Sequence, residues 1–417
     1  MARKMKDSGI EWIGEIPERW EITKIKHIVS SVTDIDHFMP DSAEFGIPYL
    51  MIGDLKDLSS SIDWDSSKKI SIEDYKKLSI KSRPQIGDII FARYASIGTT
   101  CYIDTDRDFL VSYACLTIHP SDLIIGKFLS YYLKSSSFAE DVLRRTNSNT
   151  QGNVGKDSLV NATIVLPSII EQTQIVNFLD AKCSDINSML SKTRSSIEEY
   201  KKLKQAVITQ AVTKGVRGER EMKDSGVEWI GEIPAEWSVA KAKYYVTITH
   251  GSDPKTEGSI PVYGSGAESF KTCGEYKEGP TVLIGRKGAT LHIPHYIEGK
   301  YWNVDTAFDV KAKNNFSLLY YYYLATSFDY KFYIAQTTLP GMTQSNYYNM
   351  FLPFPTFPEQ EEIVNYLDAK CAEIDKLIAK KEQLVKELES YKRSLIYEVV
   401  TGKREIFTDI TRKFPNI

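Results

Sequence analysis

Two long segments of the chain carry apolar residues at alternating intervals of three and four positions. The first run extends from Val176 to Ala211 and the second from Val364 to Val399, while the positions between are largely charged or polar. Apolar residues spaced in this way form a narrow stripe along one side of an α-helix, as in a coiled coil. The pattern predicts two helices of about 43 residues, each roughly 65 Å long.

The two predicted helices share the same starting and stopping signals. Each begins beside a proline, with a hydroxyl residue three positions before a glutamate, which is the sequence of a capping box. Each ends at a glycine, which terminates helices well. These positions are Pro167, Ser168, Glu171 and Gly215 in the first helix, and Pro358, Thr356, Glu359 and Gly402 in the second.

A narrow apolar stripe on an otherwise charged helix requires a partner helix. The chain contains two such helices with matching stripes, so we expect them to pair with each other. An antiparallel pair would give the chain a pseudo-two-fold axis and place the globular parts at opposite ends. The alternative is that each helix packs only on its own globular domain.

The sequence contains an internal duplication of one structural unit. Residues Met5–Pro17 return almost unchanged at Met222–Pro234, 217 positions later. The run from Glu171 returns at Glu359, 188 positions later, and its register holds without gaps along the helix. The fall in offset makes the second globular segment 29 residues shorter than the first. The sequence predicts a duplicated fold whose flanks stayed alike while the interiors diverged.

Both globular segments mix short β-like runs with helical ones. Strands are predicted at 47–53, 88–93, 161–166 and 281–284, and helices at 123–133 and 317–325. The run Tyr320–Tyr323 lies in the last of these helices, so we expect it to pack in a core. The fold class is therefore α+β, with two similar globular domains of mixed β-sheet and helices, separated by two long α-helices that form an antiparallel coiled coil. The expected divisions are a first globular domain at 1–166 (with repeat segment 5–20), a first long helix at 167–221, a second globular domain at 222–354 (with repeat segment 222–237), and a second long helix and tail at 355–417.

The charge, hydropathy and cysteine content of the chain exclude few classes of protein. The chain has a net charge of -3 and an isoelectric point near 6.2, so any nucleic-acid binding must rely on local positive charge. No apolar run reaches the roughly 18 residues of a membrane span. Five cysteines are scattered without CxxC pairs, which fits a reducing compartment. We expect a cytoplasmic protein without membrane contact.

A search for catalytic motifs finds none. There is no phosphate-binding loop of the GxxxxGK[ST] type, no Asn/Asp-Pro-Pro-aromatic tetrad of amino-methyltransferases and no nuclease-like set of acidic residues with lysine. His292-x-x-His295 has metal-like spacing but no third ligand nearby in sequence. Cys183 and Cys371 occupy matched stripe positions and are expected in the core. We therefore expect no catalytic residue, no metal site and no cofactor bound by this chain.

Matched polar loops are the candidates for binding. Arg93 and Arg286 each follow a predicted strand at corresponding positions, and amide-rich segments at 144–153 and 340–346 also correspond. Arginine pairs with guanine, Asn or Gln with adenine, and Lys, Ser or Thr with phosphates. The alternative is that these are ordinary polar loops whose side chains bind their own backbone. The predicted DNA-binding residues are Arg93, Tyr94, Ser96, Thr99, Arg144, Arg145, Asn147, Asn149, Thr150, Gln151, Asn153, Tyr263, Ser265, Arg286, Lys287, Thr290, Thr343, Gln344 and Asn346.

Three features together resemble the specificity (S) subunits of type I restriction-modification systems. They are the Gly-x-Glu-Trp-Ile-Gly-Glu-Ile-Pro openings, the Pro-(x)3-Glu-Gln helix starts followed by Ile-Val-Asn-Phe/Tyr-Leu-Asp, and the order domain, helix, domain, helix. The resemblance covers residues 5–404. It implies two target recognition domains, each reading one half of a split, asymmetric double-stranded DNA site with a fixed gap.

The same resemblance implies partners. Two methyltransferase (modification) subunits would dock on the helices, and restriction/translocase subunits would join them. S-adenosylmethionine, ATP and Mg would then be bound by those partners. The DNA sequence that is read does not follow from the residues. Two other hypotheses remain open: a coiled-coil protein-interaction scaffold without DNA binding, and an enzyme with an unrecognised site.

Overall fold

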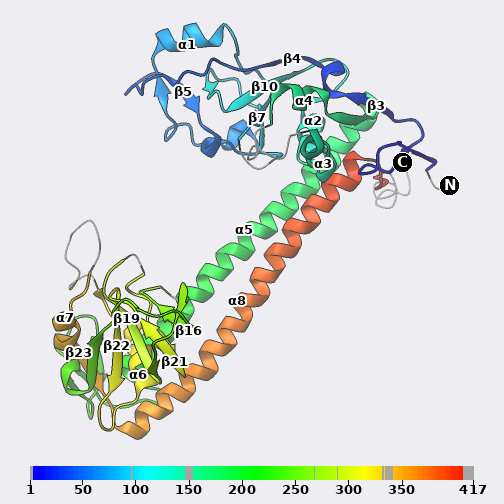
Figure 1. Cartoon of the computed structure of the whole chain (residues 1–417). Helices are drawn as coiled ribbons and strands as arrows, with labels where there is room; N and C mark the ends of the chain where they lie inside the picture. The colour runs from blue at the N-terminus through cyan, green and yellow to red at the C-terminus, as the bar shows by residue number, and fades with distance from the viewer. Residues whose placement is uncertain are drawn as a thin grey trace. The chain divides into compact units, whose positions relative to one another are not determined.

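The structure is a computed structural model that describes residues 3–94, 97–145, 154–266, 268–288, 290–330, 333 and 341–406. The chain divides into two compact units. The first comprises residues 1–192 and 384–417, and the second comprises residues 193–383. Each unit contains one globular lobe together with parts of both long helices (Figure 1). Among the described residues, no helix has the length and apolar character needed to cross a membrane.

Two long helices are present where the heptad pattern predicts them. Helix α5 spans Ile169–Lys214 and α8 spans Phe357–Val400, with 46 and 44 residues. Both end near a glycine with positive φ, Gly215 at 75° and Gly402 at 74°. Residues other than glycine rarely adopt this backbone conformation.

Only the first of the two predicted capping boxes is confirmed. The Ser168 amide donates to Glu171 Oε2 at 3.2 Å, and the Glu171 amide donates to Ser168 Oγ at 3.4 Å. In the second helix, no hydrogen bond joins the Thr356 and Glu359 side chains within the described part of the chain. The Glu359 carboxylate instead accepts from Arg220 and Trp237.

The helices pack together in each unit, which confirms the predicted pairing. In the first unit, Lys392 Nζ on α8 donates to Asn187 Oδ1 on α5 at 2.9 Å. In the second, Lys204 Nζ donates to Asp375 Oδ2 at 2.6 Å. Also in the second unit, Lys381 Nζ lies 5.5 Å from the ring centre of Tyr200. Position 200 therefore faces 381 and position 204 faces 375, so the two helices run antiparallel.

The ends of the helices also join the cores of the lobes. Leu179 on α5 and Val399 on α8 belong to the main hydrophobic core of the first unit. Val212 on α5 and Leu367 on α8 belong to that of the second. The alternative expectation, that each helix packs only on its own globular domain, is therefore wrong. The helices pair with each other, and each contributes one end to the core of each lobe.

The first lobe is built on a four-stranded antiparallel sheet. Its order is β4-β10-β7-β8, with bounds Val29–Thr33, Cys115–Pro120, Ile89–Ala92 and Thr100–Tyr102. A smaller sheet has the order β6-β5-β9 (Lys69–Ile70, Ile47–Leu50, Leu110–Val111), and β5 and β9 are parallel. Two strand pairs flank them, β1 (Met5–Asp7) with β2 (Glu15–Pro17) and β3 (Glu21–Lys24) with β11 (Thr163–Leu166). The lobe's helices are α1 (Ile72–Ser79), α2 (Gly126–Leu133), α3 (Ser136–Arg145) and α4 (Lys156–Asn161).

The second lobe has the same main sheet and flanking strand pairs, and its smaller sheet has one additional strand. Its main sheet has the order β15-β22-β19-β20, with bounds Val246–His250, Ala307–Ala312, Thr281–Gly285 and His295–Ile297. A smaller sheet has the order β17-β16-β21-β18 (Lys271–Cys273, Ile260–Tyr263, Lys300–Asn303, Lys277–Glu278), and β16 and β21 are parallel. The flanking pairs are β12 (Met222–Asp224) with β13 (Glu232–Pro234) and β14 (Ser238–Lys241) with β23 (Phe351–Phe354). Helices α6 (Leu318–Ala325) and α7 (Gln344–Asn349) correspond to α2 and α4.

Most of the difference in length between the lobes lies between two matched strands. The first lobe has residues 51–88 between β5 and β7, where the second has only 264–280 between β16 and β19. The longer segment contains α1 and two short 3-10 helices. The duplicated framework was kept, and the connection between its two sheets changed in length.

Aromatic residues fill the core of the second lobe. Tyr320 and Tyr321 are fully buried, and Tyr323 is nearly so, which confirms that this run packs in a core. Tyr320 Oη donates to the backbone oxygen of Val212, so the buried hydroxyl is satisfied by the end of α5. The matched stripe residues Cys183 and Cys371 are buried as expected.

The helix seam yields a stability prediction. Ile197 is 7% exposed on the seam, so Ile197→Ala should lower the free energy of unfolding by about 2 kcal/mol. Lys381→Leu should leave it unchanged or raise it, because an apolar side chain suits the stripe better than an ammonium group. Urea unfolding of the full chain measures both. A greater loss from Lys381→Leu than from Ile197→Ala would show that Lys381 does not lie on the seam.

Candidate nucleic-acid interface

In the first unit, the loop after β7 begins with Arg93. Its side chain is 14% exposed and contacts Asp34 through Nη1 and Oδ2 at 3.1 Å. Its guanidinium carbon lies 5.8 Å from the ring centre of Tyr94, which is 45% exposed. Thr99, later in the same loop, accepts a backbone hydrogen bond from Ala92 at 3.0 Å. Arg93 is thus a charge held in place by a carboxylate, beside an exposed ring.

In the second unit, three loops meet near the end of β19. Ser265 Oγ and Thr290 Oγ1 lie 3.2 Å apart, which links the loop after β16 to the loop after β19. Lys287 forms an isolated antiparallel β-bridge with Gly341, which precedes α7. The predicted residue Tyr263, at the end of β16, packs on a small apolar cluster of the same lobe. These contacts bring together three segments that are far apart in sequence.

The same backbone contact joins the matched loops in both units. The Val154 amide donates to the Arg93 oxygen at 3.0 Å, and the Met342 amide donates to the Arg286 oxygen at 2.8 Å. A backbone hydrogen bond therefore joins the loop after β7 to the segment before α4 in the first unit. The equivalent bond joins the loop after β19 to the segment before α7 in the second unit. The sequence predicted Arg93 and Arg286 as matched positions. Residues 146–153 of the predicted amide-rich segment lie outside the described residues, so the contact in the first unit is that of Val154.

The candidate arginines already have acidic partners within the chain. Arg286 Nη1 lies 3.2 Å from Asp305 Oδ2. Arg144 contacts Glu140 at 2.9 Å and lies 4.6 Å from the ring centre of Trp12, while Arg145 binds the buried carboxylate of Asp141. An anionic ligand would have to compete with these carboxylates.

Some predicted polar side chains bind the backbone, as the alternative reading of these loops expected. Thr343 caps α7 by accepting from the Asn346 amide at 3.0 Å. Gln344 Nε2 donates to the Ile248 oxygen at 2.6 Å, and Asn346 Nδ2 donates to the Tyr333 oxygen at 3.0 Å. The predicted residues Ser96, Asn147, Asn149, Thr150, Gln151 and Asn153 lie outside the described residues.

A repeated charged cluster was not singled out from the sequence. In the first unit, the Glu171 carboxylate accepts from Arg3 Nη2 at 2.6 Å and from Trp20 Nε1 at 3.2 Å. The arginine lies over the indole, with its guanidinium carbon 5.1 Å from the ring centre. The cluster ties the N-terminal repeat segment to the first turn of α5.

The second unit contains the same cluster, more deeply buried. Glu359 Oε1 accepts from Arg220 Nη1 at 2.6 Å, Glu359 Oε2 accepts from Trp237 Nε1 at 3.0 Å, and Arg220 lies 5.2 Å from the indole centre. Arg3 and Arg220 share the 217-residue offset of the repeat, so the signal was present in the sequence. Glu171 and Glu359 therefore anchor the two repeat segments to the long helices.

The described side chains form no cluster that suggests catalysis. The described part of the chain holds no group of three or more His, Cys, Asp or Glu residues placed to bind a metal ion. Burial raises the pKa of the Cys183 and Cys371 thiols, which keeps them protonated and poorly nucleophilic. Burial lowers the pKa of His295, the second histidine of the HxxH pair, which therefore stays neutral.

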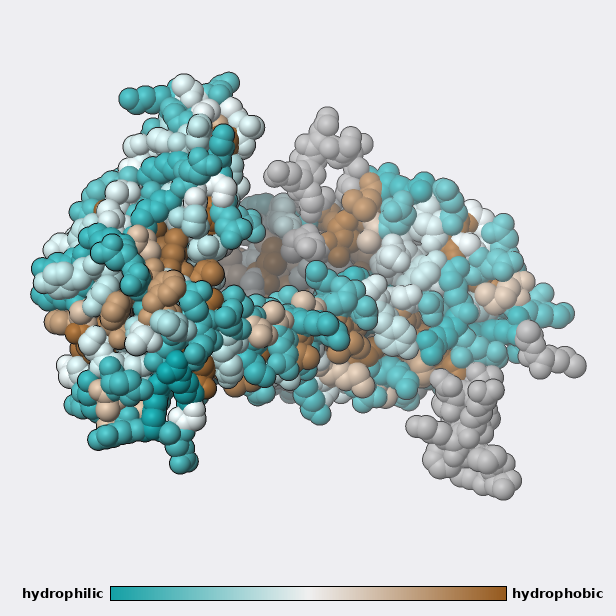
Figure 2. Space-filling model, turned by 90° about the horizontal axis from the view of Figure 1, so that it is seen from below, coloured by the Kyte–Doolittle hydropathy of each residue, from teal (hydrophilic) through white to brown (hydrophobic). Residues whose placement is uncertain are grey.

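The surface of the chain is largely hydrophilic on the face shown in Figure 2, where hydrophobic residues appear as separate patches. No single broad apolar area is seen among the coloured residues of this face. This geometry defines an internally duplicated binding protein. It has two lobes of one topology and two paired helices.

Comparison with known proteins gives the family. A family model described as the type I restriction modification DNA specificity domain matches residues 17–199 and 239–387. Because these matches cover well over half of the chain, the chain belongs to this family: it is the DNA specificity subunit of a type I restriction-modification system, the non-catalytic component.

One relative resembles the chain along nearly its whole length, and another along about half of it. A putative type I restriction enzyme MjaX specificity subunit of Methanocaldococcus jannaschii is 25% identical over 95% of this chain and 96% of its own. The EcoBI specificity subunit of Escherichia coli is 23% identical over 47% of this chain and 42% of its own.

Two solved structures share the fold. A chain from a study of complex assembly and conformational transition of the type I R-M system has a TM-score of 0.72 and 16% identity, and the match covers 93% of this chain and 99% of that one. The HsdS subunit of Thermoanaerobacter tengcongensis has a TM-score of 0.51 and 16% identity, covering 93% and 98%.

The difference in burial between Glu171 and Glu359 predicts unequal losses of stability when each is substituted. The Glu359 side chain is 2% exposed and its counterpart Glu171 is 25% exposed. Glu359→Gln should therefore destabilise the chain by about 3 kcal/mol, because it removes the buried carboxylate that binds Arg220 and Trp237 and leaves Arg220 only the exposed carboxylate of Glu236. Glu171→Gln should cost clearly less, since water can solvate Arg3. Urea unfolding with tryptophan fluorescence compares the two variants, and equal losses would contradict this account.

Proposed function

We propose that each lobe reads one half of a bipartite, asymmetric DNA target and that the paired helices set the unread gap between the halves. The observation that carries this proposal is the loop junction formed twice, at Arg93 with Val154 and at Arg286 with Met342. The junction has one backbone geometry but different surrounding side chains in the two lobes. A fold that reads two different DNA sequences needs the same backbone geometry in both lobes and different side chains around it.

The chemistry of the junctions suits contact with DNA. The guanidinium groups of Arg93 and Arg286 form ion pairs with Asp34 and Asp305. A guanidinium group can form bidentate hydrogen bonds with a phosphate or with the edge of guanine. Lys287 has no carboxylate partner among the described residues, which leaves its ammonium group for a phosphate. DNA binding would exchange the internal ion pairs for contacts with the nucleic acid.

The helices are proposed to dock two methyltransferase subunits, with restriction/translocase subunits joining that core. The proposal is supported by the near-identical helix starts in the two copies, which suit two copies of one partner. The solved chain with the same fold comes from a study of complex assembly of the type I system. S-adenosylmethionine, ATP and Mg would be bound by the partners, and the complex would act on cytoplasmic DNA.

A protein-interaction scaffold without DNA binding is the second candidate, favoured by the net charge of -3. The two candidates differ in their response to salt. Phosphate contacts release counterions, so DNA affinity should fall steeply as salt rises. A scaffold has no such dependence.

Exchange of one lobe tests the modular proposal. Replacing residues 21–166 with the corresponding lobe of another specificity subunit should change one half of the methylated target and leave the other half and the gap intact. Sequencing of methylated sites in cells that carry the chain and its methyltransferase subunits gives the result. The modular account fails if both halves change. Residues 238–354 offer the reciprocal exchange as a control.

Lys287→Ala should weaken DNA binding by the assembled complex at every target sequence and reduce the salt slope by about one. Fluorescence anisotropy at several salt concentrations measures both quantities. Lys202→Ala, on the exposed surface of α5, removes the same charge away from the loops and is the control. A change in target sequence preference with an unaltered salt slope would instead place Lys287 on a base.

A further inference from the structure

Each of the two matched arginines forms an ion pair with an aspartate, but the two aspartates come from different parts of the lobes. Arg93 lies just after β7, and its Nη1 is 3.1 Å from Oδ2 of Asp34, which follows β4. Arg286 lies just after β19, the equivalent strand, and its Nη1 is 3.2 Å from Oδ2 of Asp305, between β21 and β22. The same residue at the same place in the fold is therefore held by a different connection in each lobe.

The strand register shows that Asp34 and Asp305 do not occupy equivalent positions. The inner strands β10 and β22 begin opposite the last residues of β7 and β19. Thr33 pairs with the third residue of β10, and Thr249 pairs with the third residue of β22. Asp34, the next residue in the first lobe, is therefore equivalent to His250 in the second.

A second pair of equivalent positions has the reverse arrangement. Tyr113 and Asp305 each lie two residues before the inner strand begins. The first lobe thus has Asp34 and Tyr113 where the second has His250 and Asp305. Each lobe keeps one carboxylate for its arginine and has an aromatic ring at the alternative position.

The two guanidinium groups also lie against different aromatic rings. The guanidinium carbon of Arg93 is 5.8 Å from the ring centre of Tyr94, which is exposed on the loop. The guanidinium carbon of Arg286 is 6.0 Å from the ring centre of Phe308, which is buried on β22. The change in the position of the carboxylate is therefore accompanied by a change in where the arginine side chain lies.

A carboxylate can orient an arginine without preventing it from reading a base. A guanidinium group has five N–H donors in a planar fork, so one edge can bind the carboxylate while another faces outward. A phosphate is charged and competes with the carboxylate, so contact with a phosphate requires exchange of the ion pair. The O6 and N7 acceptors of guanine belong to a neutral base, and contact with them does not require this exchange.

We propose that Asp34 and Asp305 are positioning residues that orient the matched arginines toward guanine bases at different places in the two half-sites. This inference rests on the proposed function. The arginine is the reader that both lobes share, and the position of the carboxylate decides which base pair the arginine reaches. Two lobes with the same arginine at the same backbone position can then recognise different sequences.

Removal of each carboxylate tests the proposal. Asp34→Asn should relax recognition at one G·C pair in the half-site of the first lobe, and Asp305→Asn should do so in the half-site of the second. Discrimination at that pair should fall about tenfold, and the other pairs should stay strict. Sequencing of methylated sites in cells that carry the chain and its methyltransferase subunits measures this. Asp36→Asn and Asp253→Asn are the controls, because each removes an exposed charge close in sequence to position 34 or 250.

A variant that keeps the positive charge separates orientation from electrostatics. Arg93→Lys retains the charge but loses the planar fork. It should relax the same base pair as Asp34→Asn, and the double variant Asp34→Asn/Arg93→Lys should relax it no further. Relaxation of a different base pair by Arg93→Lys would show that Asp34 does not act through Arg93.

Moving the carboxylate tests whether its position matters. His250→Asp/Asp305→Tyr gives the second lobe the arrangement of the first. The His250 ring centre lies 5.0 Å and the Arg286 guanidinium carbon 6.0 Å from the ring centre of Phe308, so an aspartate at 250 would be near the arginine. The double variant should recognise a changed base pair in the half-site of the second lobe and leave the other half intact. A variant that only loses discrimination, as expected for Asp305→Asn, would show that the position of the carboxylate does not orient the arginine.

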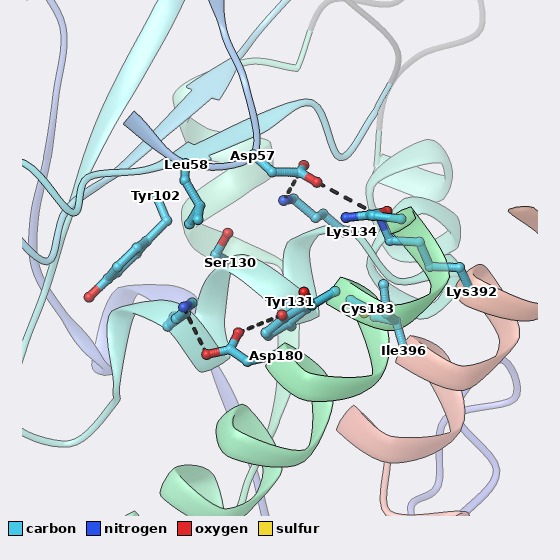
Figure 3. A pocket seen from close by; sticks show the side chains of 13 residues that line it. Asp57, Leu58, Tyr102, Ser130, Tyr131, Lys134, Asp180, Cys183, Lys392 and Ile396 are labelled. Carbon is cyan, nitrogen blue, oxygen red and sulfur yellow. Dashed lines mark hydrogen bonds and ion pairs between the residues drawn. The ribbon is translucent and has the colours of Figure 1, made fainter. Parts of the chain in front are cut away.

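These substitutions should leave the contact between lobe and helices intact. In the first unit, a pocket between α2, α5 and α8 marks this contact, and Asp57 there binds Lys134 and Lys392 (Figure 3). Neither Asp34 nor Arg93 lines that pocket. Thermal unfolding of each purified variant checks that the fold is intact.

The outcomes separate this inference from the proposed function. If the wild type methylates a bipartite target and the folded aspartate variants methylate it as strictly, the inference is overturned while the proposed function stands. Tighter binding at every sequence without relaxation of any base pair would also overturn it, because DNA would then displace the carboxylates. Equal relaxation in the controls would have the same consequence. If the wild type has no bipartite target, the proposed function fails and the inference fails with it.

Discussion

The antiparallel seam between α5 and α8 is the interaction on which the rest of the structure depends. Its apolar stripe is long enough to stabilise two helices that would otherwise be largely exposed. The ends of both helices also enter the main cores of the lobes. Neither lobe therefore has a main core made from its own segment alone. Lys204 and Lys392 place polar contacts at matched points of the seam, which fixes the register of the pair.

The junction between lobe and helix is held by a small number of polar contacts that recur in both units. Glu171 and Glu359 each bind an indole and a guanidinium group from the preceding repeat segment. The tyrosine–aspartate pairs hold α2 and α6 against the long helices. Tyr131 and Asp180 also line a pocket of the first unit, and Tyr323 and Asp368 line a pocket of the second.

Much of the fold could be predicted from the sequence. The heptad spacing and the duplication gave the two helices, their glycine ends and the correspondence of the lobes. The candidate loops were predicted as matched positions, and the backbone contacts of Arg93 with Val154 and of Arg286 with Met342 were found only in the structure. The individual side chains were less predictable. Gln344 and Asn346 bind backbone oxygens, and Arg144 and Arg145 are held by nearby carboxylates. Side chains of these types serve either use, so their residue type alone does not decide between them.

The sequence by itself determined the duplication, the helical seam and the membership of the lobes in one α+β class, because periodicity and repetition are properties of the order of residues. Only the tertiary structure decided which side chains meet. The anchor of Glu359 joins residues more than 100 positions apart, and the first pocket combines α2, α5 and α8. Such contacts depend on the packing of segments distant in sequence, which no local pattern encodes. In the first unit, Arg3 and Trp20 share Glu171 Oε1 and leave Oε2 for the capping box. In the second unit, Arg220 and Trp237 bind different oxygens of Glu359.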